Sequence, residues 1–132
     1  MTRLLPFAAA ALALTACSTI PSGPPTTVSV ANTSWRVAGV NGRPTPPGPN
    51  FNMSFDSVRM SAKFGCNGMG ADYLERGAII DLGPVIGTKM ACPDMSYEID
   101  AGRVLSTDVE KRWTSPVSLR LVSPGGSIDL VR

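Results

Sequence analysis

The segment FGCNGMG, residues 64–70, constrains the fold of this chain more than any other stretch does. Its three glycines and its asparagine tolerate positive φ angles, so the backbone can bend sharply or bulge there. A phosphate-binding loop would have to open a helix with a lysine and a serine or threonine, and residues 71–76 do not provide one. We therefore interpret the segment as a bend in a β-sheet.

Alternating apolar and polar residues predict β-strands on both sides of this bend. The alternation over residues 51–55 and 58–64 is typical of a hairpin that turns its apolar face to the core. In the strand 34–40, Trp35 is the residue that we expect to face the core. Further strand patterns lie at residues 78–82, 85–88, 117–121 and 128–131, the last two forming a closing hairpin.

A helical pattern begins near Pro93, a residue type that suits the first turn of a helix. Apolar and small residues then follow at steps of four, three, three and four, which predicts one buried helix face. This face comprises Met95, Ile99, Gly102, Leu105 and Val109, while the charged residues Glu98, Arg103, Asp108 and Lys111 lie away from it.

These elements predict a mainly β fold. We expect a curved mixed sheet of about seven strands, folded into a pseudo-barrel with one α-helix packed on it. The stretch Pro44–Pro49 is predicted to be a stiff surface loop, because its prolines lack the amide donor that a central strand needs.

The N-terminus has the layout of a lipoprotein signal peptide. Residues 1–16 carry one positive charge and then an apolar run that is too short to span a bilayer. The sequence Leu14-Thr15-Ala16-Cys17 resembles a lipobox, which predicts that Cys17 is lipidated and becomes the first mature residue. Residues 17–32 then form a proline-rich tether, and residues 33–132 form the domain.

The predicted anchor also suggests a location. Acyl chains hold a protein at a membrane by burying methylene groups, at roughly 0.8 kcal/mol each. Ser18 follows Cys17 where retention at the inner membrane would favour an aspartate. By resemblance to the sorting of Gram-negative lipoproteins, we expect the outer membrane of the cell envelope, facing the periplasm.

Composition argues against several functions. The chain contains no histidine, the commonest general base and metal ligand at neutral pH. Its net charge is only +2 and its basic residues are dispersed, so no nucleic-acid partner is expected. We predict no catalytic residue, no metal and no cofactor.

Several marks run in order through residues 33–132. They are Trp35, the Asn41-Gly42 turn, Phe55, Gly65-Cys66-Asn67, Tyr73, the segment Thr88-Lys89-Met90-Ala91-Cys92, Glu98, Leu105 and the pair Leu119 and Leu121. This order resembles the META domain family, the HslJ-like exported proteins and lipoproteins of bacteria. The resemblance implies a mainly β pseudo-barrel with one helix. It also implies a role in stress at the cell envelope, including heat induction and antibiotic tolerance, and it supplies no catalytic motif.

Cys66 and Cys92 remain once Cys17 is assigned to lipid. An exported location is oxidising enough for a disulfide between them. The disulfide would close a loop of roughly 26 residues and stabilise the fold by about 3 kcal/mol. Two unpaired buried thiols are the alternative. A redox-active thiol is the third possibility, although neither cysteine has a CxxC partner.

The sequence thus predicts a non-enzymatic envelope lipoprotein, monomeric and attached to the membrane through Cys17, with an envelope protein as its partner. One alternative is an exported inhibitor of a protease or lysozyme that uses the Pro44–Pro49 loop. Another is a carrier of a small apolar ligand, if the interior near Phe51, Met53 and Met60 is hollow. The enzyme alternative rests on four dispersed carboxylates, Asp72, Glu75, Asp81 and Asp94.

Overall fold

The computed structural model describes Cys17 and residues 28–132. The predicted signal peptide and residues 18–27 of the predicted tether lie outside the described residues. The strands are β1 (Thr33–Val40), β2 (Arg43–Pro44), β3 (Phe51–Phe55), β4 (Arg59–Phe64), β5 (Gly68–Arg76), β6 (Ile79–Leu82), β7 (Ile86–Gly87), β8 (Val109–Ser115), β9 (Ser118–Ser123) and β10 (Gly126–Val131). The helix is α1 (Ser96–Val104).

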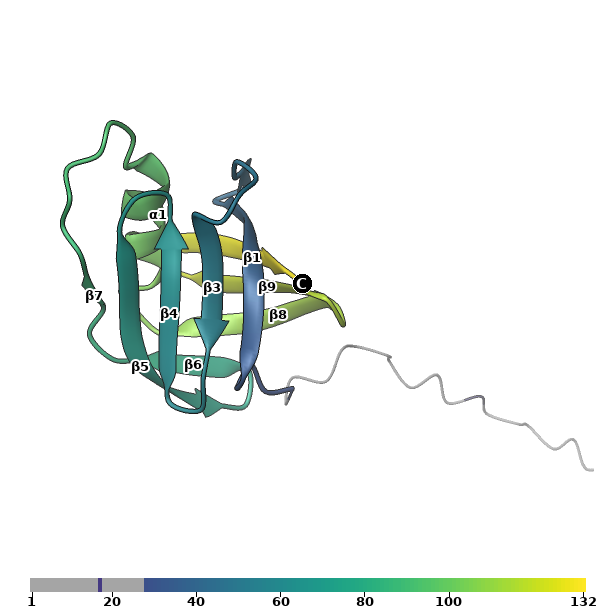
Figure 1. Cartoon of the computed structure of the whole chain (residues 1–132). Coiled ribbons are helices and arrows are strands. Elements are labelled where there is room, and N and C mark those ends of the chain that lie inside the picture. The colour runs from purple at the N-terminus through teal and green to yellow at the C-terminus, as the bar shows by residue number, and fades with distance from the viewer. Residues whose placement is uncertain (1–16, 18–27) are drawn as a thin grey trace, which may run out of the picture.

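Eight of these strands close into a barrel. The order is β1, β3, β4, β5, β6, β8, β9 and β10, and β10 pairs with β1 again (Figure 1). The two short strands extend the sheet, β2 alongside β1 and β7 alongside the first half of β5. The predicted mainly β pseudo-barrel with one helix is confirmed. The sheet is not mixed as predicted, because all pairings between the described strands are antiparallel.

Two long strands, β5 and β8, did not stand out in the sequence. β5 begins inside the glycine-rich segment, where Gly68 and Gly70 have no side chains to show an apolar alternation. In β8 the inward position between Val109 and Trp113 is taken by Lys111, a charged residue that interrupts the apolar pattern. Both strands are central to the barrel, since each pairs with neighbours on both sides.

The predicted helix was too long, and its predicted buried face was correct at Leu105 but not at Ile99. α1 ends at Val104, and Val109 is the first residue of β8 rather than part of the helix. Ile99 is 51% exposed, whereas Glu98, Ala101 and Val104 are buried. The reason is that a buried carboxylate, which counts as polar in a periodicity search, belongs to the inward face.

One contiguous core fills the space between the sheet and α1. The helix packs on β10, β4 and β1, and so covers one opening of the barrel (Figure 1). Phe51, Met53 and Met60 belong to the buried core cluster. The cleft described below is lined by other residues, so these three side chains fill the core rather than line that cleft.

The first described residues of the domain lie against a buried ion pair. Lys111 Nζ donates to Glu75 Oε1 at 2.8 Å, and the Lys111 side chain is only 1% exposed. Residues 28–30, which the sequence assigned to the tether, lie against this pair: Lys111 Nζ also donates to the Val28 carbonyl oxygen at 2.9 Å. The Val30 amide donates to Glu75 Oε1 at 2.8 Å, and the Val30 side chain is fully buried.

These contacts set the ionisation of Glu75. Burial by itself raises the pKa of Glu75, but the hydrogen bonds from Lys111, Ser29 and Val30 outweigh it and hold the pKa below its ordinary value of 4.5. A carboxyl with a lowered folded-state pKa stabilises the fold above its unfolded pKa, and this contribution is lost as the pH falls through the folded pKa.

We therefore expect Glu75→Gln to lower the free energy of unfolding at pH 7 by about 3 kcal/mol, because it leaves the Lys111 ammonium buried without a counter-charge. Urea unfolding measures this, and the difference from the wild type should shrink at acid pH. Asp72→Asn removes an exposed ion pair with Arg59 and serves as the control with little effect. Equal stabilities of wild type and Glu75→Gln at pH 7 would contradict the role of this pair.

Candidate functional site

Cys66 and Cys92 form a disulfide in the structure, with their Cα atoms 6.4 Å apart. Cys66 lies in the bend between β4 and β5, and Cys92 lies four residues before α1. The segment 83–95 links β6 to α1 and contains β7; we call it the strap. The disulfide therefore fastens the strap to the bend that the sequence singled out.

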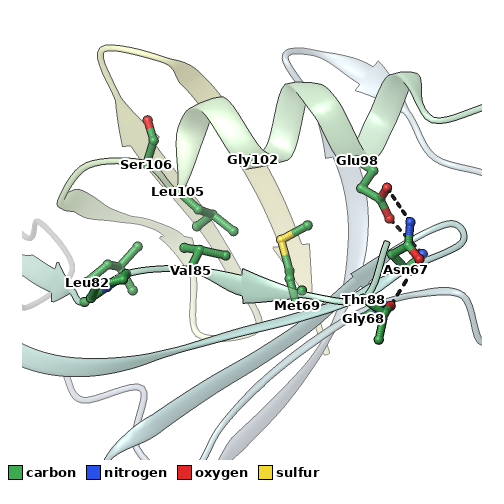
Figure 2. A pocket seen from close by; sticks show the side chains of 13 residues that line it. Asn67, Gly68, Met69, Leu82, Val85, Thr88, Glu98, Gly102, Leu105 and Ser106 are labelled. Atoms are coloured by element: carbon green, nitrogen blue, oxygen red, sulfur yellow. Dashed lines mark hydrogen bonds between the residues drawn. The ribbon is translucent and has the colours of Figure 1, made fainter. Parts of the chain in front are cut away.

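Asn67, next to Cys66, is the centre of a buried polar network. It is only 2% exposed. Its backbone amide donates to Glu98 Oε1 at 2.7 Å, and its side-chain Nδ2 donates to Glu98 Oε2 at 3.0 Å (Figure 2). Both carboxylate oxygens of Glu98, on α1, thus bind one residue of the sheet bend.

The same amide also holds the strap. Asn67 Oδ1 accepts from Thr88 Oγ1 at 3.1 Å and from the Met90 amide at 2.8 Å. Asn67 Nδ2 donates a second time, to the Met90 carbonyl oxygen at 3.1 Å. Because an asparagine amide offers two donors and one oxygen with two lone pairs, Asn67 uses its full hydrogen-bonding capacity here.

A cleft of about 700 Å³, open to solvent on one side, lies between the strap and α1. Figure 2 shows the side chains of Met69, Val85 and Leu105 between the strap and the helix, with Glu98 and Asn67 at one end. The residues that line it are Asn67, Gly68, Met69, Leu82, Gly83, Pro84, Val85, Gly87, Thr88, Glu98, Gly102, Leu105 and Ser106. The cleft is thus apolar along its length and acidic at one end.

The four carboxylates of the enzyme alternative each bind a different partner in the protein. The hydrogen bond from Arg76 holds the pKa of Asp81 below its usual range, and the Ser96 amide does the same for Asp94. Asp72 shares a surface depression with Asp81 but pairs with Arg59 at 3.1 Å. Within the described residues, no three Cys, Asp or Glu side chains gather as a metal site would require.

The comparison with family models identifies the class of protein. The META domain model matches residues 28–130. This chain therefore belongs to the META domain family, as the spacing of its motifs predicted.

Solved structures agree with the fold. One NMR structure superposes with a TM-score of 0.66 at 17% identity, covering 77% of this chain and 90% of the other. A second, of a protein from Burkholderia xenovorans, gives a TM-score of 0.59 at 20% identity and covers 78% and 83% of the two chains. At these identities the likeness concerns the fold alone. A comparison with curated proteins gives no match.

Sequence reasoning located this site only in part. The disulfide and the bend were predicted. Asn67 and Glu98 were named as marks of the family resemblance, but Asn67 was interpreted as a turn residue and Glu98 as a charge away from the buried helix face. The signal that could have found the pair is the position of Glu98, three residues before the buried Ala101 on the same helix. Cys17 is exposed, and nothing in the fold tests its lipidation.

The Asn67 network predicts a pH-dependent variant. Asn67→Asp replaces the Nδ2 donor by an acceptor facing the Glu98 carboxylate, and should lower the free energy of unfolding by about 3 kcal/mol at pH 7. The neighbouring negative charge raises the pKa of the introduced carboxyl, so the folded state takes up a proton and the loss shrinks as the pH falls.

Urea unfolding at pH 7 and pH 4 measures this dependence. Asn50→Asp, at an exposed residue just before β3, is the matched control and should show no such recovery in acid. A loss that is the same at both pH values would exclude charge repulsion at Glu98 as its cause.

Proposed function

We propose that this chain is a non-enzymatic lipoprotein of the cell envelope, whose META domain holds a small, largely apolar molecule between the strap and α1. The cleft carries this proposal. Its volume of about 700 Å³ lies within the range of small-molecule sites, and its lining combines apolar side chains with one polar end. Binding without chemistry is consistent with the described carboxylates Asp81 and Asp94, whose lowered pKa values make them weak bases.

The envelope location rests on the sequence around Cys17. Leu14-Thr15-Ala16-Cys17 fits lipidation, and an acyl anchor would need no membrane-crossing element in the domain. α1, the helix that the described residues form, is not long and apolar enough to cross a bilayer. A role in tolerance of heat or antibiotics follows from the family resemblance and is part of the same proposal.

Anchoring is tested with Cys17→Ala in a Gram-negative host. The wild-type protein should sediment with outer membranes, and its intact mass should show a mature chain that begins at Cys17 and carries acyl groups. Cys17→Ala should lack the acyl mass and leave the membrane fraction, and should not restore heat or antibiotic tolerance to a strain that lacks the protein. A wild-type protein with a free, alkylatable Cys17 thiol would contradict the proposal that a lipid at Cys17 anchors the protein.

Inhibition of an envelope hydrolase is the second candidate, and the loop between β2 and β3 favours it. Thr45 ties the start of the loop to β1, since its amide donates to the Ala38 carbonyl oxygen at 3.1 Å. Asn52 Nδ2 ties its end by donating to the Pro49 carbonyl oxygen at 2.6 Å. Residues 46–50 are exposed between these two anchors, so a stiff segment projects from the barrel.

Affinity capture from envelope extracts tests this candidate. If the loop binds a protease or lysozyme, a variant with residues 46–49 replaced by two glycines should lose that partner while keeping its thermal stability. An unchanged set of captured proteins would reject the inhibitor function.

A further inference from the structure

We infer that the cleft selects molecules that join a protonated amine to an aliphatic or aromatic body, with the amine at Glu98 and the apolar part along the strap and α1. This inference rests on the proposed function, because it names the chemical class of the ligand that the cleft would hold. Three features of the cleft carry it: its charge, the state of its hydrogen-bond donors and the helix glycine in its wall.

The first feature is charge. Of the thirteen described residues that line the cleft, Glu98 alone is charged. Its two oxygens each accept one hydrogen bond from Asn67, and a carboxylate oxygen can accept a second. The residue is 9% exposed, so a charge that reaches it from the cleft is only weakly screened by water. An ammonium group supplies both the charge and the donors that this end of the cleft still lacks.

The second feature is that the donors around the cleft are already used. The Thr88 hydroxyl donates to Asn67 Oδ1 at 3.1 Å, and the Ser106 hydroxyl donates to the Arg103 carbonyl oxygen at 2.8 Å. The amides of Leu82, Gly83 and Thr88 donate to other parts of the protein. An anionic ligand would thus meet few donors and one negative charge, which disfavours its binding.

The third feature is Gly102, which lies in the last turn of α1. Glycine is less favourable than alanine in a helix, so its presence here needs a reason. Packing gives none, since a Cβ atom at Gly102 would meet nothing within 4 Å. Gly102 lies one turn beyond Glu98 and lines the cleft, so the missing side chain leaves the space next to the carboxylate open.

The apolar wall continues from this opening. Leu105 follows Glu98 by seven residues, about 10 Å along the helix axis, a span that a medium-length alkyl chain can cover. Met69 on β5 and Val85 on the strap face the same space (Figure 2). Burial of methylene groups against these side chains would supply affinity, and the Glu98 end would supply selectivity.

The test uses three probes that share an eight-carbon chain: n-octylammonium, n-octanol and n-octanoate, each below its micelle concentration. They are titrated at pH 7 into the full chain carrying Cys17→Ser with its disulfide intact, and binding is followed by NMR. Octylammonium should saturate the site and bind roughly tenfold or more tightly than octanol, because a charge-assisted hydrogen bond adds to the same apolar contact. Octanoate should bind most weakly, and the largest shifts should fall on Met69, Val85 and Leu105.

Two variants locate the site. Gly102→Leu fills the open space, so it should abolish probe binding while raising the melting temperature, since leucine favours a helix. Arg103→Leu, at an exposed position of the same helix outside the cleft lining, is the matched control and should bind as the wild type does. Glu98→Gln should bind octylammonium and octanol equally; should it not fold, Gly102→Leu and the probe series on the unaltered cleft decide.

The outcomes separate the two claims. Equal affinities for all three probes, abolished by Gly102→Leu, would overturn the amine selectivity and leave the proposed apolar carrier intact. Absence of saturable binding by any probe, or full binding by Gly102→Leu, would overturn both. Preference for octanoate would reverse the sign of the inference and reject it.

Discussion

The pair of hydrogen bonds between Asn67 and Glu98 is the interaction on which the rest of this structure depends. It joins the bend after β4 to the helix that covers the barrel opening, and the same Asn67 amide holds the strap at Thr88 and Met90. A buried carboxylate costs free energy unless its oxygens are hydrogen-bonded, and here both are. The disulfide acts on the same junction through the neighbouring residue, Cys66. The strap and α1, which follow each other in the chain, are therefore fixed at a single point to the bend, which lies 31 residues before Glu98.

A second buried charge lies at the far end of β5. Asn67 precedes the first residue of this strand, and Glu75 is its penultimate residue. At about 3.3 Å per residue, the two polar centres stand more than 20 Å apart along the strand. The Glu75–Lys111 pair orders the chain entry at Val28 and Val30, whereas the Asn67–Glu98 pair orders the strap and the helix. β5 thus connects the end of the barrel that receives the tether with the end that carries the cleft.

The sequence predicted the architecture better than the site, for a physical reason. The hairpin of β3 and β4, the closing hairpin and the segment before α1 have regular patterns, because their side chains only separate core from solvent. The missed parts are those where a polar residue is buried. β8 was not predicted because Lys111 occupies one of its inward positions, and the helix face was mispredicted because Glu98 points inward. A search for apolar periodicity assigns both charged residues to the surface. Glu75 is 36 residues from Lys111, and Asn67 is 31 residues from Glu98. No local sequence pattern could therefore predict either pairing.

The cleft follows from this arrangement. The strap pairs with the sheet as a strand through only two residues, those of β7. Its position beside the helix therefore depends on contacts outside this strand pairing. The disulfide and the Asn67 bonds fix its last part, and the turn at Gly83, whose amide donates to the Asp72 carbonyl oxygen at 2.9 Å, fixes its start. Between these anchors Val85 lies beside Leu105 (Figure 2), and open space remains at Gly102, where a Cβ atom would meet nothing within 4 Å. A fold that needed only a cover for the barrel would gain stability by filling this space with side chains. This fold instead places a buried carboxylate, Glu98, and a glycine of the last helical turn, Gly102, beside the same opening. The strap, the disulfide and the Asn67 bonds therefore keep this opening in place rather than merely cover the barrel.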